Sequence, residues 1–151
     1  MKIAIIGTGN VGTRLGKLLA SSNHQITMGS RNQQRAEEVA LALGSNVTGK
    51  ICKYAVEDAE VVIIATPWSE NATIKSIQDL DDLAGKIVID CTNPLALDYM
   101  SNTLGHTTSS SEEIAKLIPQ AFVVKAFNTI FADVMQPGKQ TFTGHRGTGF
   151  Y

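Results

Sequence analysis

Hydrophobic and polar positions alternate along the chain in blocks that predict a regular exchange of strands and helices. Short apolar runs bounded by glycine, proline or polar residues are typical of strands covered on both faces of a sheet. Such runs occur at Lys2–Ile6, His24–Met28, Val61–Ala65, Lys86–Asp90 and Ala121–Ala126, with weaker candidates at Asn46–Thr48 and Gln140–Thr143. The β-branched run that begins at Val61 is the strongest strand signal in the chain.

Between these runs, apolar residues recur at helical spacing. Val11, Leu15, Leu18 and Leu19 follow the i, i+4, i+7, i+8 rule, which places one stripe of a helix against a core. Helices are predicted at Asn10–Ala20, Arg31–Leu43, about Ser69–Leu80 and Glu112–Ile118, with a helical turn near Tyr54–Ala59. Gly44 is placed to end the second helix, and Ser110 with Glu113 predicts a capping box at the start of the last one, after the polar loop Ser101–Ser111.

Strands that alternate with helices over short connections predict an α/β fold with a doubly wound parallel sheet of the Rossmann type. We expect one such domain over residues 1–143, followed by a short tail at 144–151. In open sheets of this kind, ligands lie beyond the carboxyl ends of the strands. The chemistry is therefore expected in the segments that follow each strand.

The composition of the chain limits the kinds of partner that it can bind. A length of 151 residues fits a single domain, and a net charge of −1 gives no electrostatic attraction for nucleic acid or for an acidic membrane surface. No apolar run approaches the length of a membrane span, and the two cysteines, Cys52 and Cys91, have neither disulfide nor zinc spacing. We expect a cytoplasmic protein that uses neither nucleic acid, membrane nor metal.

The first strand is followed directly by glycines at positions 7, 9 and 12, with the third inside a helix. In dinucleotide-binding folds, Gly7 would permit the tight turn, Gly9 would let the backbone approach a diphosphate, and Gly12 would allow close packing of helix and strand. The alternative is a structural turn that holds no ligand.

The end of the second strand indicates which dinucleotide is bound. An NAD site has an acidic residue there for the ribose hydroxyls, whereas this chain has Ser30, Arg31 and Asn32, with Arg35 one turn later. A guanidinium provides forked donors for a 2′-phosphate and a plane on which adenine can stack. The predicted cofactor is therefore NADP(H), the alternative being that both arginines are merely solvated charges.

Three further strand ends carry candidate residues. Ala65, Thr66, Pro67 and Trp68 follow one strand; Trp68 would lie at the rim of the cleft or, equally, in a core or a dimer contact. Asn93 and Asn128 follow two others and could bind the carboxamide of nicotinamide or a second substrate, or simply cap turns.

Catalytic motifs of hydrolases are absent. The three histidines have no metal-ligand spacing, and neither a nucleophile elbow nor an HExxH motif occurs. Hydride transfer between two cofactor rings would need none of these groups, since the protein only aligns the donor and acceptor carbons. No residue is assigned a catalytic role.

Five blocks together, IIGTGNVG, GSRN, ATPW, IDCTNPL and VVKAFNTI, resemble the family of coenzyme F420-dependent NADP oxidoreductases and, more distantly, the oxidoreductase domain of the STEAP metalloreductases. The resemblance implies that Thr8, Gly9, Asn10 and Val11 wrap the diphosphate and that Ser30, Arg31 and Arg35 hold the 2′-phosphate. It also implies that Thr66 and Pro67 border the nicotinamide, with Trp68 near the second ring.

The function implied by the resemblance is hydride transfer between NADPH and a planar acceptor, either the deazaflavin coenzyme F420 or a flavin such as FMN or FAD. A catalytically inactive NADP(H)-binding module or sensor is the alternative, and a homodimer is compatible with either. Family members usually continue for some tens of residues past the VVKAFNT block with a segment that helps to form the second-substrate pocket. From Gly144 onward, this chain departs from the expected acidic glycine-aspartate pattern, which predicts a shortened C-terminal part.

Overall fold

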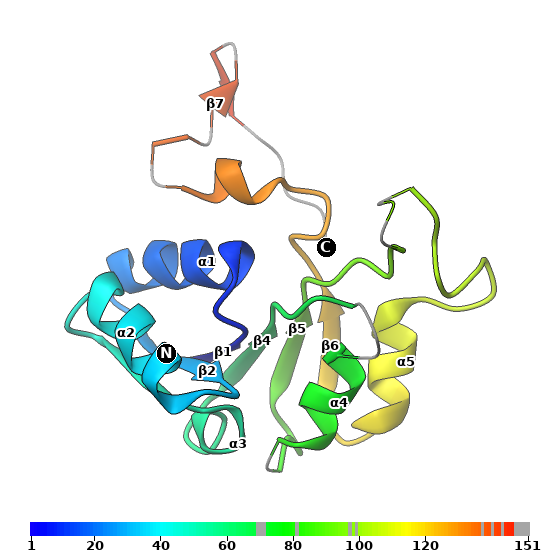
Figure 1. Cartoon of the computed structure of the whole chain (residues 1–151), viewed down its shortest axis with the longest axis horizontal. Coiled ribbons are helices and arrows are strands. Elements are labelled where there is room, and N and C mark those ends of the chain that lie inside the picture. The colour runs from blue at the N-terminus through cyan, green and yellow to red at the C-terminus, as the bar shows by residue number, and fades with distance from the viewer. Residues whose placement is uncertain are drawn as a thin grey trace.

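A six-stranded sheet, parallel throughout, forms the centre of the computed structural model, with the strand order β3-β2-β1-β4-β5-β6 (Figure 1). The structure describes residues 1–68, 72–80, 82–96, 98, 100–136, 138–139, 141–142 and 144–146. The order reverses between β1 and β4, which creates the switch point at which ligands of doubly wound sheets bind. The predicted Rossmann architecture is confirmed.

The strands and helices follow one another as the hydrophobic pattern predicts. The strands of the sheet are β1 (Lys2–Ile6), β2 (Gln25–Ser30), β3 (Val47–Ile51), β4 (Val61–Ile64), β5 (Ile87–Asp90) and β6 (Phe122–Lys125). The helices are α1 (Asn10–Ser21), α2 (Gln33–Leu43), α3 (Cys52–Ala55), α4 (Ala72–Gln78), α5 (Ser110–Leu117) and the 3-10 helix η2 (Ala132–Met135). A short antiparallel pair, β7 (Thr141–Phe142) and β8 (His145–Arg146), follows.

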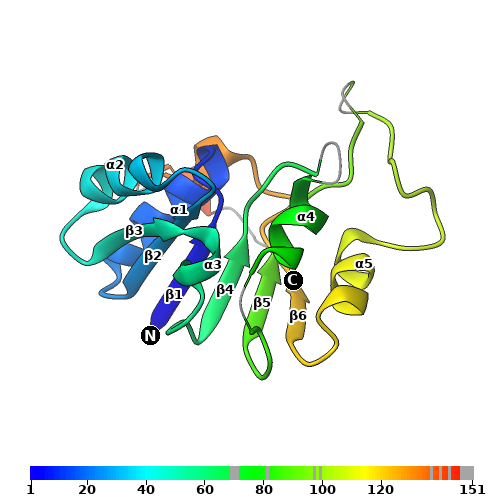
Figure 2. The same cartoon turned by 60° about the horizontal axis from the view of Figure 1, so that its bottom comes forward.

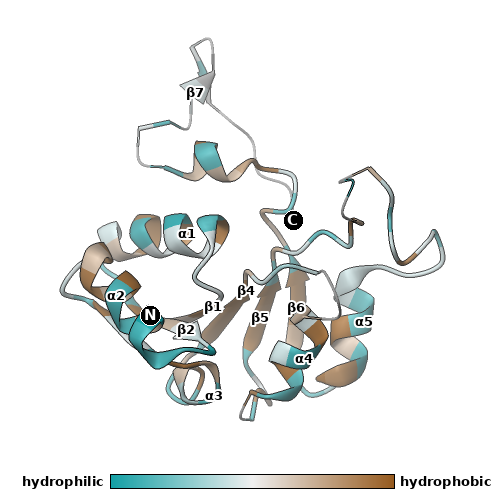
Figure 3. Ribbon diagram, in the orientation of Figure 1, coloured by the Kyte–Doolittle hydropathy of each residue, from teal (hydrophilic) through white to brown (hydrophobic). Residues whose placement is uncertain are grey.

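Two hydrophobic clusters lie on the two faces of the sheet. One packs α1, α2 and η2 against the sheet, as Leu15, Val39 and Met135 show. The other packs α3, α4 and α5 against the opposite face through Ala55, Ile77 and Ile114. Figure 2 shows these two helical layers, and Figure 3 shows the strands between them as the most hydrophobic part of the chain. Burial of the strands on both faces explains why their sequences are continuous apolar runs.

The boundaries of the strands and helices differ from the predicted ones by a few residues, and the predicted cap of the last α-helix was wrong. The capping box is formed by Ser109 with Glu112, not by Ser110 with Glu113: the Ser109 hydroxyl accepts from the Glu112 N–H, and the Glu112 carboxylate accepts from the Ser109 N–H at 2.7 Å. The hydroxyl of Ser110 is instead buried against Asp90. Gly44 ends α2 as predicted, with a positive φ of 142°.

Some predicted positions fall outside the described residues. The predicted start of the third helix, 69–71, is one of them, and so are 140 and 143 at the ends of the last predicted strand. Among the described residues, none of the helices combines the length and apolar character that crossing a membrane requires.

Candidate functional site

The predicted site residues come together because all six strands run in the same direction. Their carboxyl ends share one edge of the sheet, and the loops after β1, β2, β4, β5 and β6 therefore meet there (Figure 1). A separate cavity of about 580 Å³, lined by residues such as Lys2, Gln25 and Ser45, shares none of the predicted residues. The candidate site is the carboxyl edge of the sheet.

The glycine loop after β1 is shaped by close backbone contacts. Gly7 has a φ of 118°, and a Cβ on it would lie 2.5 Å from the carbonyl oxygen of Ala65. A Cβ on Gly12 would lie 2.0 Å from the carbonyl oxygen of Gly7. Only glycine fits at both positions, so the turn and the seating of α1 on the sheet depend on them.

Gly9 differs from the other two glycines of the loop, because a Cβ at this position would meet no atom of the described residues within 4 Å apart from its chain neighbours. It is also the N-cap residue of α1, and no side chain caps that end of the helix. The first N–H groups of a helix need partners and carry partial positive charge. A bare helix start beside open space is what a diphosphate requires, so Gly7 to Gly12, with Thr8, Asn10 and Val11 between them, fit this part of NADP(H).

Two arginines follow β2: Arg31 lies in the turn after the strand, and Arg35 lies in the first turn of α2. Asn32 accepts a hydrogen bond from the Arg35 N–H at 2.9 Å and so acts as the N-cap of α2, while Ser30 accepts from the Asn32 N–H at 3.2 Å. The Arg35 side chain is 57% exposed and pairs with Glu38 at 3.9 Å. Within the described part of the chain, Arg31 makes no ion pair, and its exposed guanidinium is available to an anion.

The loop after β4 turns inward. The hydroxyl of Thr73, on α4, donates to the carbonyl of Pro67 at 3.0 Å and lies 3.0 Å from the Thr66 hydroxyl. Trp68 is only 8% exposed and packs in the cluster beneath α4 and α5. Of the two interpretations of Trp68, the structure supports the core position, which leaves Ala65, Thr66 and Pro67 at the rim.

Asn93 and Asn128 join the ends of β5 and β6. The Asn93 amide donates to the carbonyl oxygen of Asn128 at 2.8 Å, and the Asn128 amide donates to the Asn93 side-chain oxygen at 3.4 Å. Phe127, immediately before, has a φ of 64°, a region that residues other than glycine rarely adopt. The two predicted residues are thus brought together at the rim on a strained turn.

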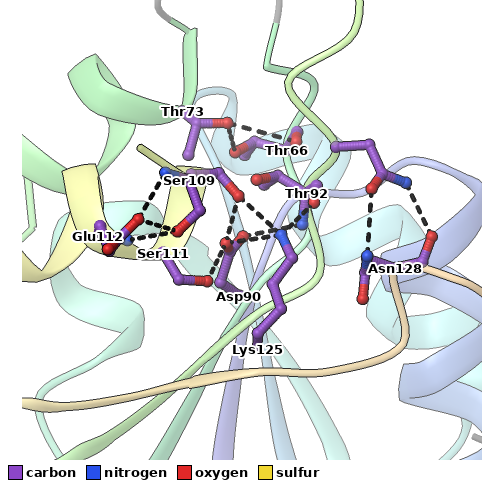
Figure 4. A network of polar contacts seen from close by, with 11 residues as sticks. Thr66, Thr73, Asp90, Thr92, Ser109, Ser111, Glu112, Lys125 and Asn128 are labelled. Atoms are coloured by element: carbon purple, nitrogen blue, oxygen red, sulfur yellow. Dashed lines mark hydrogen bonds and ion pairs between the residues drawn. The ribbon is translucent and has the colours of Figure 1, made fainter. Parts of the chain in front are cut away.

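Sequence reasoning missed a buried charged network next to this rim (Figure 4). Asp90 is fully buried and forms an ion pair with Lys125 at 2.8 Å. Its carboxylate also accepts from the hydroxyls of Ser110 and Ser111 and from the N–H of Thr92, each at 2.8 Å. The sequence does contain a signal for this network, because the apolar strands IVID and FVVK each end in a charged residue. The two strands pair in parallel, which brings those charged ends together.

The network changes the acid-base properties of the buried groups. Burial raises the pKa of Asp90, but the hydrogen bond and charge of Lys125 and the hydrogen bonds of Thr92 outweigh it, so this pKa lies below its ordinary value. Burial, with a contribution from the Asp90 carboxylate, raises the pKa of Cys91 to about 12. Asp90 is therefore a permanent anion at neutral pH, and Cys91 is no thiolate nucleophile.

Comparison with known proteins identifies the family. Residues 2–94 match the family model described as NADP oxidoreductase, coenzyme F420-dependent. The chain belongs to this family. The resemblance inferred from its five sequence blocks is thereby confirmed.

Individual relatives agree with this assignment. The chain is 34% identical over 137 residues to metalloreductase STEAP3 of Rattus norvegicus, covering 91% of this chain and 26% of that protein. It is 32% identical over 151 residues to the F420-dependent NADP reductase of Methanocaldococcus jannaschii, covering 90% of this chain and 66% of that one. The crystal structure of an Arthrobacter sp. FB24 protein assigned as an F420-dependent NADP reductase superposes with a TM-score of 0.78 at 31% identity, covering 95% of this chain and 70% of that one.

The shared part is limited in extent. The chain spans about a quarter of the metalloreductase and about two thirds of the F420-dependent reductase. A reductive aminase of Aspergillus terreus in complex with NADPH, at 18% identity and a TM-score of 0.65, shares the fold. The part of the structural relatives that corresponds to this chain shares its fold.

Proposed function

We propose that this protein is an NADP(H)-dependent oxidoreductase that transfers a hydride between NADPH and a deazaflavin, a flavin or a similar planar acceptor. The observation that carries the proposal is the pairing of two features at neighbouring strand ends. The uncapped start of α1 suits the diphosphate, and the exposed Arg31 stands where an NAD enzyme would have a carboxylate. Family membership supports the same cofactor.

Each part of the edge would bind one part of the cofactor. The N–H groups of the Gly7–Gly12 loop would hold the diphosphate, while Ser30, Arg31 and Arg35 would hold the 2′-phosphate. Asn32 would act indirectly, because its side chain already caps α2. Thr66 and Pro67 would border the nicotinamide, and the amides of Asn93 and Asn128 would contact its carboxamide or the acceptor.

The bound cofactor would supply the chemistry, which is the transfer of a hydride from C4 of its nicotinamide ring. The protein's contribution would be to hold two flat rings in contact and to exclude water from them. The groups nearest the rim fit this limited role. The Asp90 carboxylate is already paired with Lys125, the Cys91 thiol stays protonated, and the two asparagine side chains do not titrate, so none of these groups is suited to act as an acid or a base.

Anaerobic mixing of the protein with NADPH and either coenzyme F420 or FMN tests the proposal. We expect an acceptor-dependent fall in absorbance at the nicotinamide band. Binding of NADPH without oxidation by any of these acceptors would contradict the enzyme proposal and would favour an inactive NADP(H)-binding module or a sensor. The small-molecule acceptor and the homodimer remain predictions, and sedimentation of the purified protein would test the second.

A further inference from the structure

The ammonium of Lys125 is fully occupied by the protein. It donates to the Asp90 carboxylate at 2.8 Å, to the Ser110 hydroxyl at 2.7 Å and to the carbonyl oxygen of Thr92 (Figure 4). An ammonium has three protons, and all three have acceptors here. Lys125 therefore has no donor left for a phosphate or a substrate.

These contacts connect β5, β6 and α5 to one another through a single side chain. Lys125 ends β6, Asp90 ends β5, and Ser110 begins α5. Asp90 is fully buried, and three donors, the ammonium of Lys125 and the hydroxyls of Ser110 and Ser111, share its Oδ2, so loss of Lys125 would leave a buried carboxylate without its counter-charge. The geometry of the chain immediately after β5 is thus fixed by a network that lies inside the protein.

The residue next to this network is Asn93, at the rim. Thr92 is held twice, through its N–H by Asp90 and through its carbonyl by Lys125, and its own hydroxyl is buried without a hydrogen-bond partner among the described residues. Asn93 then reaches across to Asn128. The position of the Asn93 amide depends on a backbone that Lys125 and Asp90 hold.

We propose that Lys125 is a positioning residue that sets the orientation of the nicotinamide ring without touching it, by fixing the Thr92–Asn93 rim. The proposal rests on the proposed function only in requiring that NADP(H) binds with its nicotinamide at this edge. In this proposal, the charge of Lys125 has a role even though Lys125 takes no direct part in the hydride transfer.

Three variants separate positioning from stability. Lys125→Met removes all three donors and leaves Asp90 unpaired. The double variant Asp90→Asn with Lys125→Met removes both charges and tests whether an unpaired carboxylate alone explains the result. Lys116→Met is the matched control, because Lys116 is 67% exposed on α5 and pairs only with Glu113 among the described residues.

The measurements are the Kd of NADPH by calorimetry and the fluorescence lifetime of the saturated complex, taken on protein shown to be folded by circular dichroism. We expect the Kd of both Lys125 variants to stay within about threefold of wild type, because the phosphates dominate affinity. The lifetime of the bound nicotinamide is expected to shorten towards that of free NADPH in both variants and to be unchanged in Lys116→Met. Where an acceptor is active, the single-turnover rate is expected to fall at least about tenfold, since small misplacements are costly in hydride transfer.

An unchanged lifetime in the folded double variant would overturn the proposal, and so would a Kd that rises in proportion to the loss of rate. A failure of the proposed function can be distinguished from a failure of this proposal. If only the proposed function fails, the wild-type protein binds NADPH but no acceptor oxidises it, and the comparison of lifetimes among the variants still decides the role of Lys125.

Discussion

Gly9 and Arg31 are the two positions at which we expect a single residue to determine which ligand binds. Gly7 and Gly12 are required by the protein itself, because a Cβ at either would collide with backbone. Gly9 has open space beside it and an ordinary φ of −81°, so the fold does not require glycine there. A requirement at Gly9 would come from a ligand, which makes its substitution informative.

Replacement of Gly9 by valine is expected to abolish NADPH binding while thermal unfolding stays cooperative and near the wild-type Tm. The added side chain would occupy the space in which the diphosphate approaches the backbone. Gly12→Val is the matched contrast and is expected to destabilise the protein strongly, since its Cβ would lie 2.0 Å from the Gly7 carbonyl oxygen. Normal NADPH affinity in Gly9→Val would show that the diphosphate does not lie at this loop.

Arg31→Ala is expected to weaken NADPH binding selectively. Hydrogen bonds to charged groups contribute about 1.5–3 kcal/mol, which corresponds to a loss of about 10- to 150-fold, while NADH, which lacks the 2′-phosphate, should be nearly unaffected. Lys17→Ala removes the same charge from the exposed side of α1 and serves as the control. Equal losses for the two cofactors in calorimetric titrations would argue against contact between Arg31 and the 2′-phosphate.

At the scale of the elements, β5, β6 and α5 are held together by the ion pair between Asp90 and Lys125. Asp90→Asn is expected to destabilise the protein at pH 7 by about 2–3 kcal/mol, below the usual cost of breaking a fully buried pair because Lys125 is 30% exposed. Urea unfolding of wild type and variant gives this difference. A variant as stable as wild type at pH 7 would show that the carboxylate contributes nothing.

The same pair makes stability depend on pH in a defined direction. The pKa of Asp90 is lowered in the folded state, so its contribution is fully present above the unfolded-state pKa of about 3.9 and is lost as the pH falls through the lower folded-state value. The stability difference between wild type and Asp90→Asn should therefore be constant from pH 6 to 8 and should shrink below about pH 4. A difference that grows on acidification would contradict a lowered pKa.

The elements were predictable from sequence to the extent that local pattern determines them. The strand that begins at Val61 and the cap at Gly44 depend on burial and on backbone conformation, and both can be inferred from neighbouring residues in the sequence. The choice between Ser109 and Ser110 as the cap of α5 cannot be inferred in this way. It is decided by the contact of Ser110 with Asp90, which lies 20 residues before Ser110 in the chain. The inward position of Trp68 likewise involves residues distant in the sequence, since Trp68 belongs to the cluster that contains Ala55 and Ile114.

At the scale of the whole molecule, the family assignment and the fold predict that NADP+ stabilises the native state. A ligand at 100 times its Kd that binds only the folded state contributes about 2.7 kcal/mol. For a chain of this size we expect a rise in Tm of several degrees with NADP+ and a clearly smaller one with NAD+ at the same concentration. Differential scanning fluorimetry with both nucleotides checks this, and equal shifts would indicate that the protein does not select for the 2′-phosphate.

We expect the carboxyl edge of this sheet to bind NADP(H) and the end of β2 to select it over NAD(H). Calorimetric titration of the wild-type protein with NADPH and with NADH measures both the binding and the selectivity. We predict one site per chain and a Kd at least about tenfold lower for NADPH, the difference expected from one charge-assisted contact. Equal affinities, or a preference for NADH, would contradict it.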